Sequence, residues 1–266
     1  MLLLWFILLV IGIECATVYR TRWPTYVQKK HYNPPIKPLD YCNGNLCPGN
    51  LKHITCGVQF WGPKCGKSHT GIMLTNQRDE ILKALNDFRK KVELGEVFNL
   101  PKAVKLPDIS WDEELSVIAM RVSNQCADHS ISPCVNTFRY KNVGESSDFV
   151  LLRERSKEFS AFKFFLMWFQ YHNYFPEDYV SSFPKLAQSD HLTVFANLVY
   201  EKNRKMGCGM LRSGRKYFLT CLFNKKIPPH TPVYKTDNKY LIRSKKIRNK
   251  AIFKSVKKNV SELKKN

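Results

Sequence analysis

Two cysteines near the end of the folded part of the chain could form a disulfide bond. Cys208 and Cys221 flank the segment Ser213-Gly214-Arg215-Lys216, with apolar residues on both sides. If Gly214-Arg215 forms a two-residue type II′ turn, in which the first residue needs a positive φ, the strands pair in one register. That register places Cys208 opposite Cys221 at a non-hydrogen-bonded pair, where Cα atoms are close enough for a disulfide. The stretch 194–224 therefore predicts a cross-linked strand pair.

The sequence contains nine cysteines, and eight would remain if Cys15 leaves with a signal peptide. An even number of cysteines in an exported chain favours four disulfide bonds. A zinc site is the alternative, but the closest pairs, Cys42 with Cys47 and Cys56 with Cys65, have no matching histidine cluster. Because export also favours oxidation, we expect all eight cysteines to be paired.

The remaining residue types form no catalytic motif. The sequence has neither G-x-S-x-G nor H-E-x-x-H, and it has no phosphate-binding glycine motif. Catalysis by a Cys–His pair would need a free thiol, which complete disulfide pairing removes. We therefore expect no enzymatic activity.

The N-terminus predicts export. Residues 2–13 are uninterrupted apolar, and Cys15-Ala16 follows. This run is too short to cross a bilayer comfortably but is typical of the core of a signal peptide, which we assign to residues 1–15. No second apolar run approaches the length of a membrane span, so we expect an extracellular, soluble protein.

The second strand of the pair is apolar on both faces. One face carries Tyr217, Leu219, Cys221 and Phe223, and the other carries Phe218 and Leu222. Such a strand is central in its sheet and covered on each side. We therefore expect an α+β fold with three layers, helix, sheet and helix.

Three helices are predicted to position this sheet. Residues 75–94 have an apolar stripe at helical spacing, with Thr75 as N-cap. Residues 111–126 form a second helix, capped by Ser110. The strongly aromatic run 159–174 predicts a buried helix.

The rest of the chain divides into extensions. In the extension 16–74, residues 16–40 predict an extended arm, and residues 41–74 contain four cysteines among many Gly and Pro residues and are too poor in periodic apolar residues to fold alone. We expect disulfide bonds to attach this loop-rich extension to a body spanning 75–224.

Residues 225–266 form a basic tail. They hold 14 Lys and Arg against two acidic residues, which accounts for +12 of the net charge of +21. Bases alternate with apolar residues from 239 onward, which is compatible with docking on an anionic membrane surface or a heparin-like sulfated glycan. A solvated extension is the alternative. Asn259-Val260-Ser261 is a glycosylation sequon, and export makes nucleic acid an unsuitable partner.

Several runs, taken in order, resemble a known family. These are ILKALNDFRKKVELG, PDISWDEELSVIAMRVSNQC, VGES, MWFQY, FANLVY followed by GCG, and YFLTCLFN. They resemble the CAP superfamily of cysteine-rich secretory, antigen 5 and pathogenesis-related proteins, and more closely its insect venom allergen (antigen 5) branch. The resemblance covers about residues 40–224. It implies the disulfides Cys42–Cys56, Cys47–Cys134, Cys65–Cys126 and Cys208–Cys221, the last of which the hairpin register also predicts.

The resemblance also implies a cleft. Many relatives hold a divalent metal there with two histidines and two glutamates; His129 and Glu145 match the first of each. Tyr171 stands at the second glutamate, and Val194 stands at the second histidine in a gapless alignment. His191 could serve only after a three-residue insertion. Two remaining ligands fall short of the three that catalytic zinc needs, so we expect neither metal nor another cofactor.

These observations favour a secreted, non-enzymatic, monomeric protein that binds an extracellular protein, a small lipid or an anionic partner. Two alternatives remain open. One is a metal-dependent binder or hydrolase that uses His129 and Glu145, with His191 as a third ligand. The other is an adhesive protein that binds glycans or membranes through residues 225–266.

Overall fold

The computed structural model describes residues 40–42, 45–127, 134–153, 159–187 and 190–237. Several sequence predictions lie outside these residues. They are the signal peptide 1–15, most of the extension before residue 40, His129, the tail from 238 onward and the sequon at Asn259.

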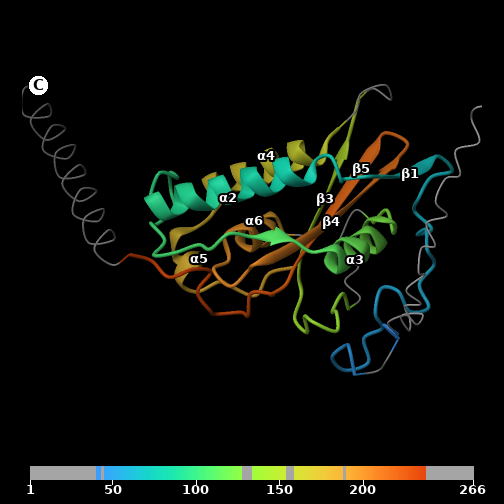
Figure 1. The fold of residues 1–266 in the computed structure, drawn as a ribbon, viewed down its shortest axis with the longest axis horizontal. Helices are drawn as coiled ribbons and strands as arrows, with labels where there is room; N and C mark the ends of the chain where they lie inside the picture. The colour runs from blue at the N-terminus through green and yellow to red at the C-terminus, as the bar shows by residue number, and fades with distance from the viewer. Residues whose placement is uncertain (1–39, 43–44, 128–133, 154–158, 188–189, 238–266) are drawn as a thin grey trace, which may run out of the picture. The chain divides into compact units, whose positions relative to one another are not determined.

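A mixed sheet forms the centre of the fold (Figure 1). Its antiparallel strands follow the order β1 (His69–Ile72), β4 (Lys205–Ser213), β5 (Lys216–Phe223) and β3 (Gly144–Leu151), and β2 (Ser110–Trp111) pairs in parallel with β4. Gly214 has a φ of 60° in the turn between β4 and β5. Ser213 pairs with Lys216 and Cys208 pairs with Cys221, which is the predicted register.

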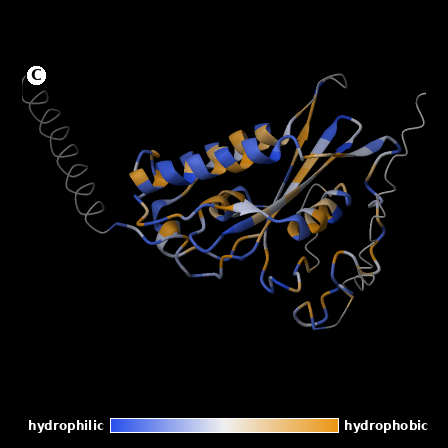
Figure 2. Cartoon of the chain, viewed as in Figure 1, coloured by the Kyte–Doolittle hydropathy of each residue, from blue (hydrophilic) through white to orange (hydrophobic). Residues whose placement is uncertain are grey.

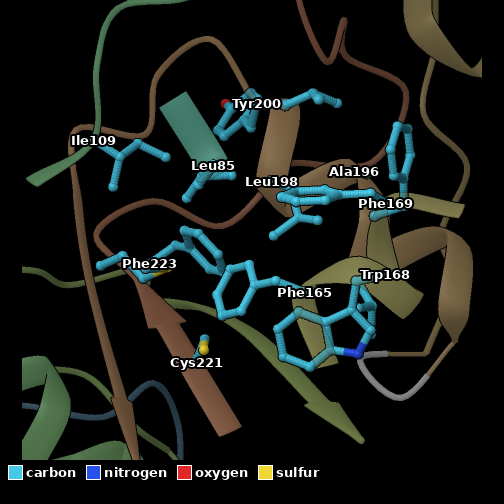
Figure 3. Close-up of a cluster of buried hydrophobic side chains, with 14 of the residues drawn as sticks. Leu85, Ile109, Phe165, Trp168, Phe169, Ala196, Leu198, Tyr200, Cys221 and Phe223 are labelled. Atoms are coloured by element: carbon cyan, nitrogen blue, oxygen red, sulfur yellow. The ribbon is translucent and has the colours of Figure 1, made fainter. Parts of the chain in front are cut away.

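Helices cover both faces of the sheet, so the three-layer prediction is confirmed. On one face lie α2 (Arg78–Leu94), α4 (Ala161–Gln170) and α6 (His191–Val199), which pack against Leu219, Cys221 and Phe223 of β5. Figure 3 shows the aromatic centre of this layer, in which Phe165, Trp168 and Phe223 are fully buried. On the other face, α3 (Glu113–Ser123) packs against Leu222.

The residue pattern of α2 explains why this segment forms a helix at the surface. Apolar and hydrophilic residues alternate along the helix (Figure 2), and its residues Ile81, Leu85 and Val92 are buried. The apolar stripe drives packing, and most charged residues of the helix remain in contact with water, with the buried Arg89 as an exception.

Two glycines allow α3 to approach the sheet closely. A Cβ atom on Gly207 would lie 2.2 Å from the backbone nitrogen of Ser116, and one on Gly209 would lie 2.3 Å from the Cα of Met120. No other residue type fits without moving the helix. The Gly-Cys-Gly run therefore sets the distance between α3 and β4.

Both predicted N-caps were wrong. The helix expected from Thr75 begins at Arg78 after Gln77, whose Oε1 accepts a hydrogen bond from the Ala161 amide at 3.0 Å. The helix expected from Ser110 begins at Glu113, because Ser110 and its neighbour are paired in β2. Asp112 caps it instead by accepting from the Leu115 amide. Tertiary pairing thus overrides the local capping pattern.

The beginning of the predicted strand pair is also different. Residues 191–199 form helix α6, capped by Asp190 through a 2.8 Å bond from the Leu192 amide. A short apolar run fits a buried helix as well as a buried strand, so periodicity alone could not separate them. The aromatic run predicted as one helix forms α4, capped by Ser160, and then the 3-10 helix η1 (Tyr171–Tyr174). A short helix, α5 (Glu177–Ser181), follows.

The folded body extends beyond the expected limits of 75–224. Strand β1 comes from the extension and pairs with β4. After residue 224, Val233 and Tyr234 are buried, and the Tyr234 hydroxyl donates to the carbonyl of Pro101 at 2.9 Å. The first part of the basic tail is therefore part of the core. Within the described ranges, no helix is long and apolar enough to cross a membrane.

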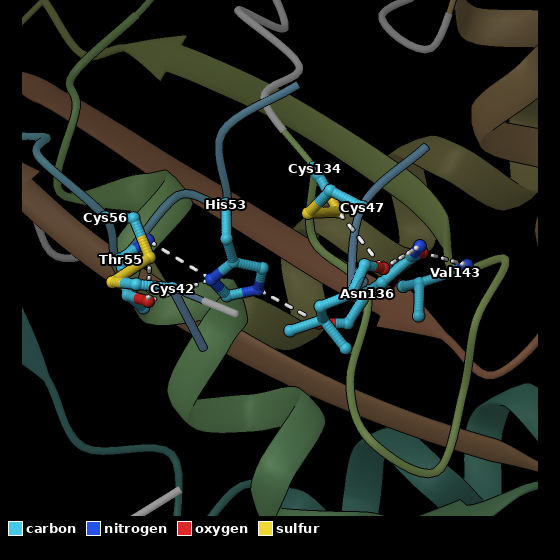
Figure 4. Close-up of a disulfide and its surroundings, with 9 residues drawn as sticks. Cys42, Cys47, His53, Thr55, Cys56, Cys134, Asn136 and Val143 are labelled. Carbon is cyan, nitrogen blue, oxygen red and sulfur yellow. Dashed lines mark hydrogen bonds between the residues drawn. A yellow bond between two sulfur atoms is a disulfide. The ribbon is translucent and has the colours of Figure 1, made fainter. Parts of the chain in front are cut away.

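Within the part of the chain that the structure describes, four disulfides form, in the pairs that the resemblance implies. Three attach the extension: Cys42–Cys56, Cys47–Cys134 and Cys65–Cys126. The fourth, Cys208–Cys221, bridges β4 and β5 with a Cα–Cα distance of 4.1 Å. Figure 4 shows the first two bonds on either side of His53.

Candidate functional site

Tyr171 and His191 come together at the end of the layer formed by α4 and α6. Tyr171 begins η1 directly after α4, and His191 is the first residue of α6. Their rings meet edge to face, with centroids 5.3 Å apart. His191 is exposed, and its Nδ1 lies 4.0 Å from a carboxylate oxygen of Asp190. Two of the sequence-predicted positions are therefore neighbours.

Asp148 on β3 completes this arrangement, although the sequence analysis did not identify it. Its Oδ2 accepts from the Tyr171 hydroxyl at 3.1 Å and from the indole Nε1 of Trp168 at 3.1 Å. Burial, together with the charge of Asp148 and this hydrogen bond, raises the pKa of Tyr171. Tyr171 is thus a neutral hydrogen-bond donor at physiological pH. The sequence contained one signal for the donors of this arrangement. Trp168 and Tyr171 are spaced i, i+3, which places both side chains on one helical face.

Glu145 lies on the opposite face of β3. It pairs with Leu222, which packs against α3, and its Oε1 accepts from the Ser147 hydroxyl at 2.7 Å. Side chains alternate along a strand, so Glu145 and Asp148 point to opposite sides of the sheet. The structure does not bring Glu145 together with Tyr171 and His191.

Val194 is a core residue that helps to fasten α6 to β3. Its side chain is buried, and its carbonyl accepts from the Ser146 hydroxyl at 3.2 Å. One turn later, Asn197 donates to the backbone carbonyl of Glu145 at 2.9 Å and to the Ser146 hydroxyl at 3.2 Å. These buried hydrogen bonds fix the position of α6 relative to β3.

The contacts that Asp148 makes with Trp168 and Tyr171 are hydrogen bonds. Among the described residues, no group of three or more His, Cys, Asp and Glu side chains could hold a metal ion. Asp148 accepts hydrogen bonds from Trp168 and Tyr171 through Oδ2 and from the Phe149 amide through Oδ1 at 2.8 Å. His129, the remaining metal candidate, lies outside the described residues.

Two hollows elsewhere could receive small ligands. A groove of about 310 Å³ lies between β1, α2 and α3, and its lining includes Met73 and Val117, which are 82% and 66% exposed. A second hollow of about 150 Å³ is lined by Phe183, Ile227 and Thr193, among others. The Thr193 hydroxyl is buried and has no hydrogen-bond partner among the described residues.

Comparison with known proteins finds a matching family model, similar proteins and a similar solved structure. The model of the family described as "CAP: Cysteine-rich secretory protein family" matches residues 82–223. Venom allergen-1 of Aedes aegypti is 28% identical over 204 residues, which cover 73% of this chain and 78% of that protein. Tabinhibitin 6 of Tabanus yao is 30% identical over 212 residues, covering 76% and 81%. The solved structure of BmVAL-1 has a TM-score of 0.54 at 18% identity and covers 67% of this chain and 88% of that one.

Proposed function

Because the chain belongs to the CAP family of cysteine-rich secretory proteins and is similar to insect venom allergens, we propose that it is a secreted protein that binds rather than catalyses. Its partner is an extracellular protein, a small lipid or an anionic surface. The observation that carries this proposal is the hydrogen bond from Tyr171 to Asp148, at the position where the resemblance expects a glutamate ligand.

Three features of the cleft support binding without metal chemistry. Tyr171 is held as a neutral donor, and Val194 offers only a buried alkyl side chain where a histidine ligand is expected. Glu145 is turned to the other face of β3. An active metal centre needs at least three protein ligands converging on one point, and these side chains do not converge.

The scaffold also supports a binding role. Four disulfides and a sheet covered on both faces hold the surface rigid, and a rigid surface loses little entropy on binding. The groove between β1, α2 and α3 exposes apolar side chains that suit an apolar segment of a ligand.

Metal analysis tests this proposal directly. The full-length secreted protein is incubated with zinc, dialysed and analysed by mass spectrometry for metal, together with His129→Ala and His191→Ala. We expect no stoichiometric zinc in any of the three proteins. If the unaltered protein retains stoichiometric zinc and His129→Ala does not, the metal-dependent alternative is established. If His191→Ala also fails to retain zinc, His191 is a ligand as well.

The basic tail supports a second mode of binding, to a heparin-like glycan or an anionic membrane. Residues 225–266 contribute +12 to a net charge of +21. Deletion of residues 238–266 should lower the salt concentration at which the protein elutes from immobilised heparin. Unchanged elution would show that the tail is a solvated extension without this role.

A further inference from the structure

The smaller of the two hollows lies where three segments meet: the loop after α5, helix α6 and the segment that follows β5. We call it the α6 hollow. Helix α6 contributes Thr193 and Asn197 to its lining. The apolar side chains of the lining come from the other two segments and are Phe183, Pro184, Leu186, Ile227 and Pro229. The hollow therefore has a mostly apolar wall with a polar strip on one helix.

Backbone hydrogen bonds hold the walls of the α6 hollow in place. The Phe183 amide donates to the Thr231 carbonyl at 2.9 Å, and the His230 amide donates to the Phe183 carbonyl at 2.6 Å. These bonds join the loop after α5 to the segment after β5, and the buried side chains of Phe183 and Ile227 pack in the core. On the helix side, Asn197 is bonded to β3 through its Nδ2. The hollow is thus formed before any ligand binds, which lowers the entropy cost of binding.

Helix α6 places two unsatisfied polar groups in this wall. Thr193 is 7% exposed, and its hydroxyl has no hydrogen-bond partner among the described residues. Asn197 is 1% exposed, and no described residue donates a hydrogen bond to its Oδ1. The i, i+4 spacing places both side chains on one helical face, and threonine has two common χ1 rotamers in helices, so its hydroxyl can turn toward a ligand. Because most buried polar groups are hydrogen-bonded, this pair favours a ligand that carries a hydrogen-bonding group.

We propose that the α6 hollow binds a small neutral molecule with one apolar ring and one hydroxyl group, of which phenol is the simplest example. The hollow measures about 150 Å³, and an engineered protein cavity of about that volume binds benzene. The apolar wall suits the ring, while Asn197 Oδ1 and the Thr193 hydroxyl suit the ligand hydroxyl. Lys185 and Lys226 also line the hollow, but both are exposed, so no charge buried in the lining favours an anion. This inference rests on the proposed binding role and names a ligand class for one site.

Titration of the full-length secreted protein with phenol and with benzene tests the site, with the amide chemical shifts of Thr193 and Ile227 as the readout. Thr193→Val keeps the size of the side chain and removes the hydroxyl. We expect the phenol affinity to fall about fivefold and the benzene affinity to stay the same or rise. The control Thr70→Val makes the same change at an exposed position of β1 and should leave both affinities as in the wild type. Urea unfolding of each variant checks the fold.

A second variant, Leu186→Trp, enlarges a half-buried side chain of the lining and should weaken the binding of both molecules. Three results would overturn the inference. The first is the absence of saturable shifts with phenol in the wild type, because the hollow would then hold water only. The others are an unchanged phenol affinity in Thr193→Val and unchanged affinities for both molecules in Leu186→Trp. The zinc measurement is independent, so a protein that binds neither phenol nor zinc loses this site but keeps the proposed function.

Discussion

His53 is expected to make the stability of the disulfide-bonded extension depend on pH. The side chain is 2% exposed, and its Nε2 lies 2.9 Å from the carbonyl of Asn136. A carbonyl only accepts, so Nε2 carries the proton. The amide of Thr55 donates to Nδ1 at 3.3 Å, and the Thr55 hydroxyl lies 2.8 Å away, so Nδ1 is an acceptor. His53 is therefore neutral, in one tautomer, between two disulfides (Figure 4).

Protonation of His53 would break this arrangement. Burial lowers the pKa of His53, and the charge of Arg121 lowers it further, while the Asn136 carbonyl acts in the opposite direction. A histidine in the unfolded chain has a pKa of about 6.5. Below that pH the unfolded state binds the proton first, so the free energy of unfolding falls as the pH falls toward the folded pKa.

The loss is at most about 1.4 kcal/mol per pH unit, or about 2 kcal/mol between pH 6.5 and 5. Urea unfolding with the disulfides intact measures it, on wild type and on His53→Gln. The glutamine keeps a donor for Asn136 but cannot titrate, and it loses the acceptor for Thr55, which costs about 1 kcal/mol at pH 7.5. We expect the two stability curves to converge as the pH falls.

A control separates His53 from the other histidines. His191→Gln changes an exposed side chain and should leave the difference between pH 7.5 and 5 as in the wild type. Parallel curves for the wild type and His53→Gln between pH 6.5 and 5 would refute the reasoning, because they would show that His53 takes up no proton on unfolding.

Three further substitutions test how the layers are held together, each by urea unfolding. Gly209→Ala should lower the free energy of unfolding by about 3 kcal/mol, because its Cβ would lie 2.3 Å from the backbone of Met120; a loss below about 1 kcal/mol would mean that α3 shifts easily. Arg89→Met should cost about 3 kcal/mol, since the fully buried guanidinium donates to three backbone carbonyls; a neutral effect would show that these carbonyls find other donors. Tyr171→Phe should cost about 1–2 kcal/mol by removing one donor to Asp148, and equal stability would show that the bond contributes nothing.

The sequence predicted those parts of the fold in which two independent signals agreed. Turn chemistry and cysteine spacing both gave the register of β4 and β5, and the two apolar faces of β5 gave the three layers. Where one local signal stood alone, tertiary contacts decided the outcome. Ser110 matched a cap pattern but pairs in β2, and residues 191–199 formed a helix although the run was equally compatible with a strand.

The site was harder to predict because its residues are related through the sheet rather than along the chain. Identification of Asp148 required the pairing of β3 with β5, since that register decides which side chains of β3 face the helices. The same register separates Glu145 from Tyr171, although a linear alignment treats both as members of one cleft. The spacing of residues along the chain identifies the candidate site residues. The alternation of side chains along β3 then decides which of them can come into contact.

Hydrogen bonds hold the junction between β3, α4 and α6 together. Asn197 and Ser146 fasten α6 to β3, and Asp148 fastens the end of α4 to the same strand through Trp168 and Tyr171. Because several of these hydrogen bonds share partners in a partly or fully buried environment, they support one another as a network. At the position where the resemblance expects a glutamate, Tyr171 joins the end of α4 to β3 because its phenol donates a hydrogen bond to the carboxylate of Asp148.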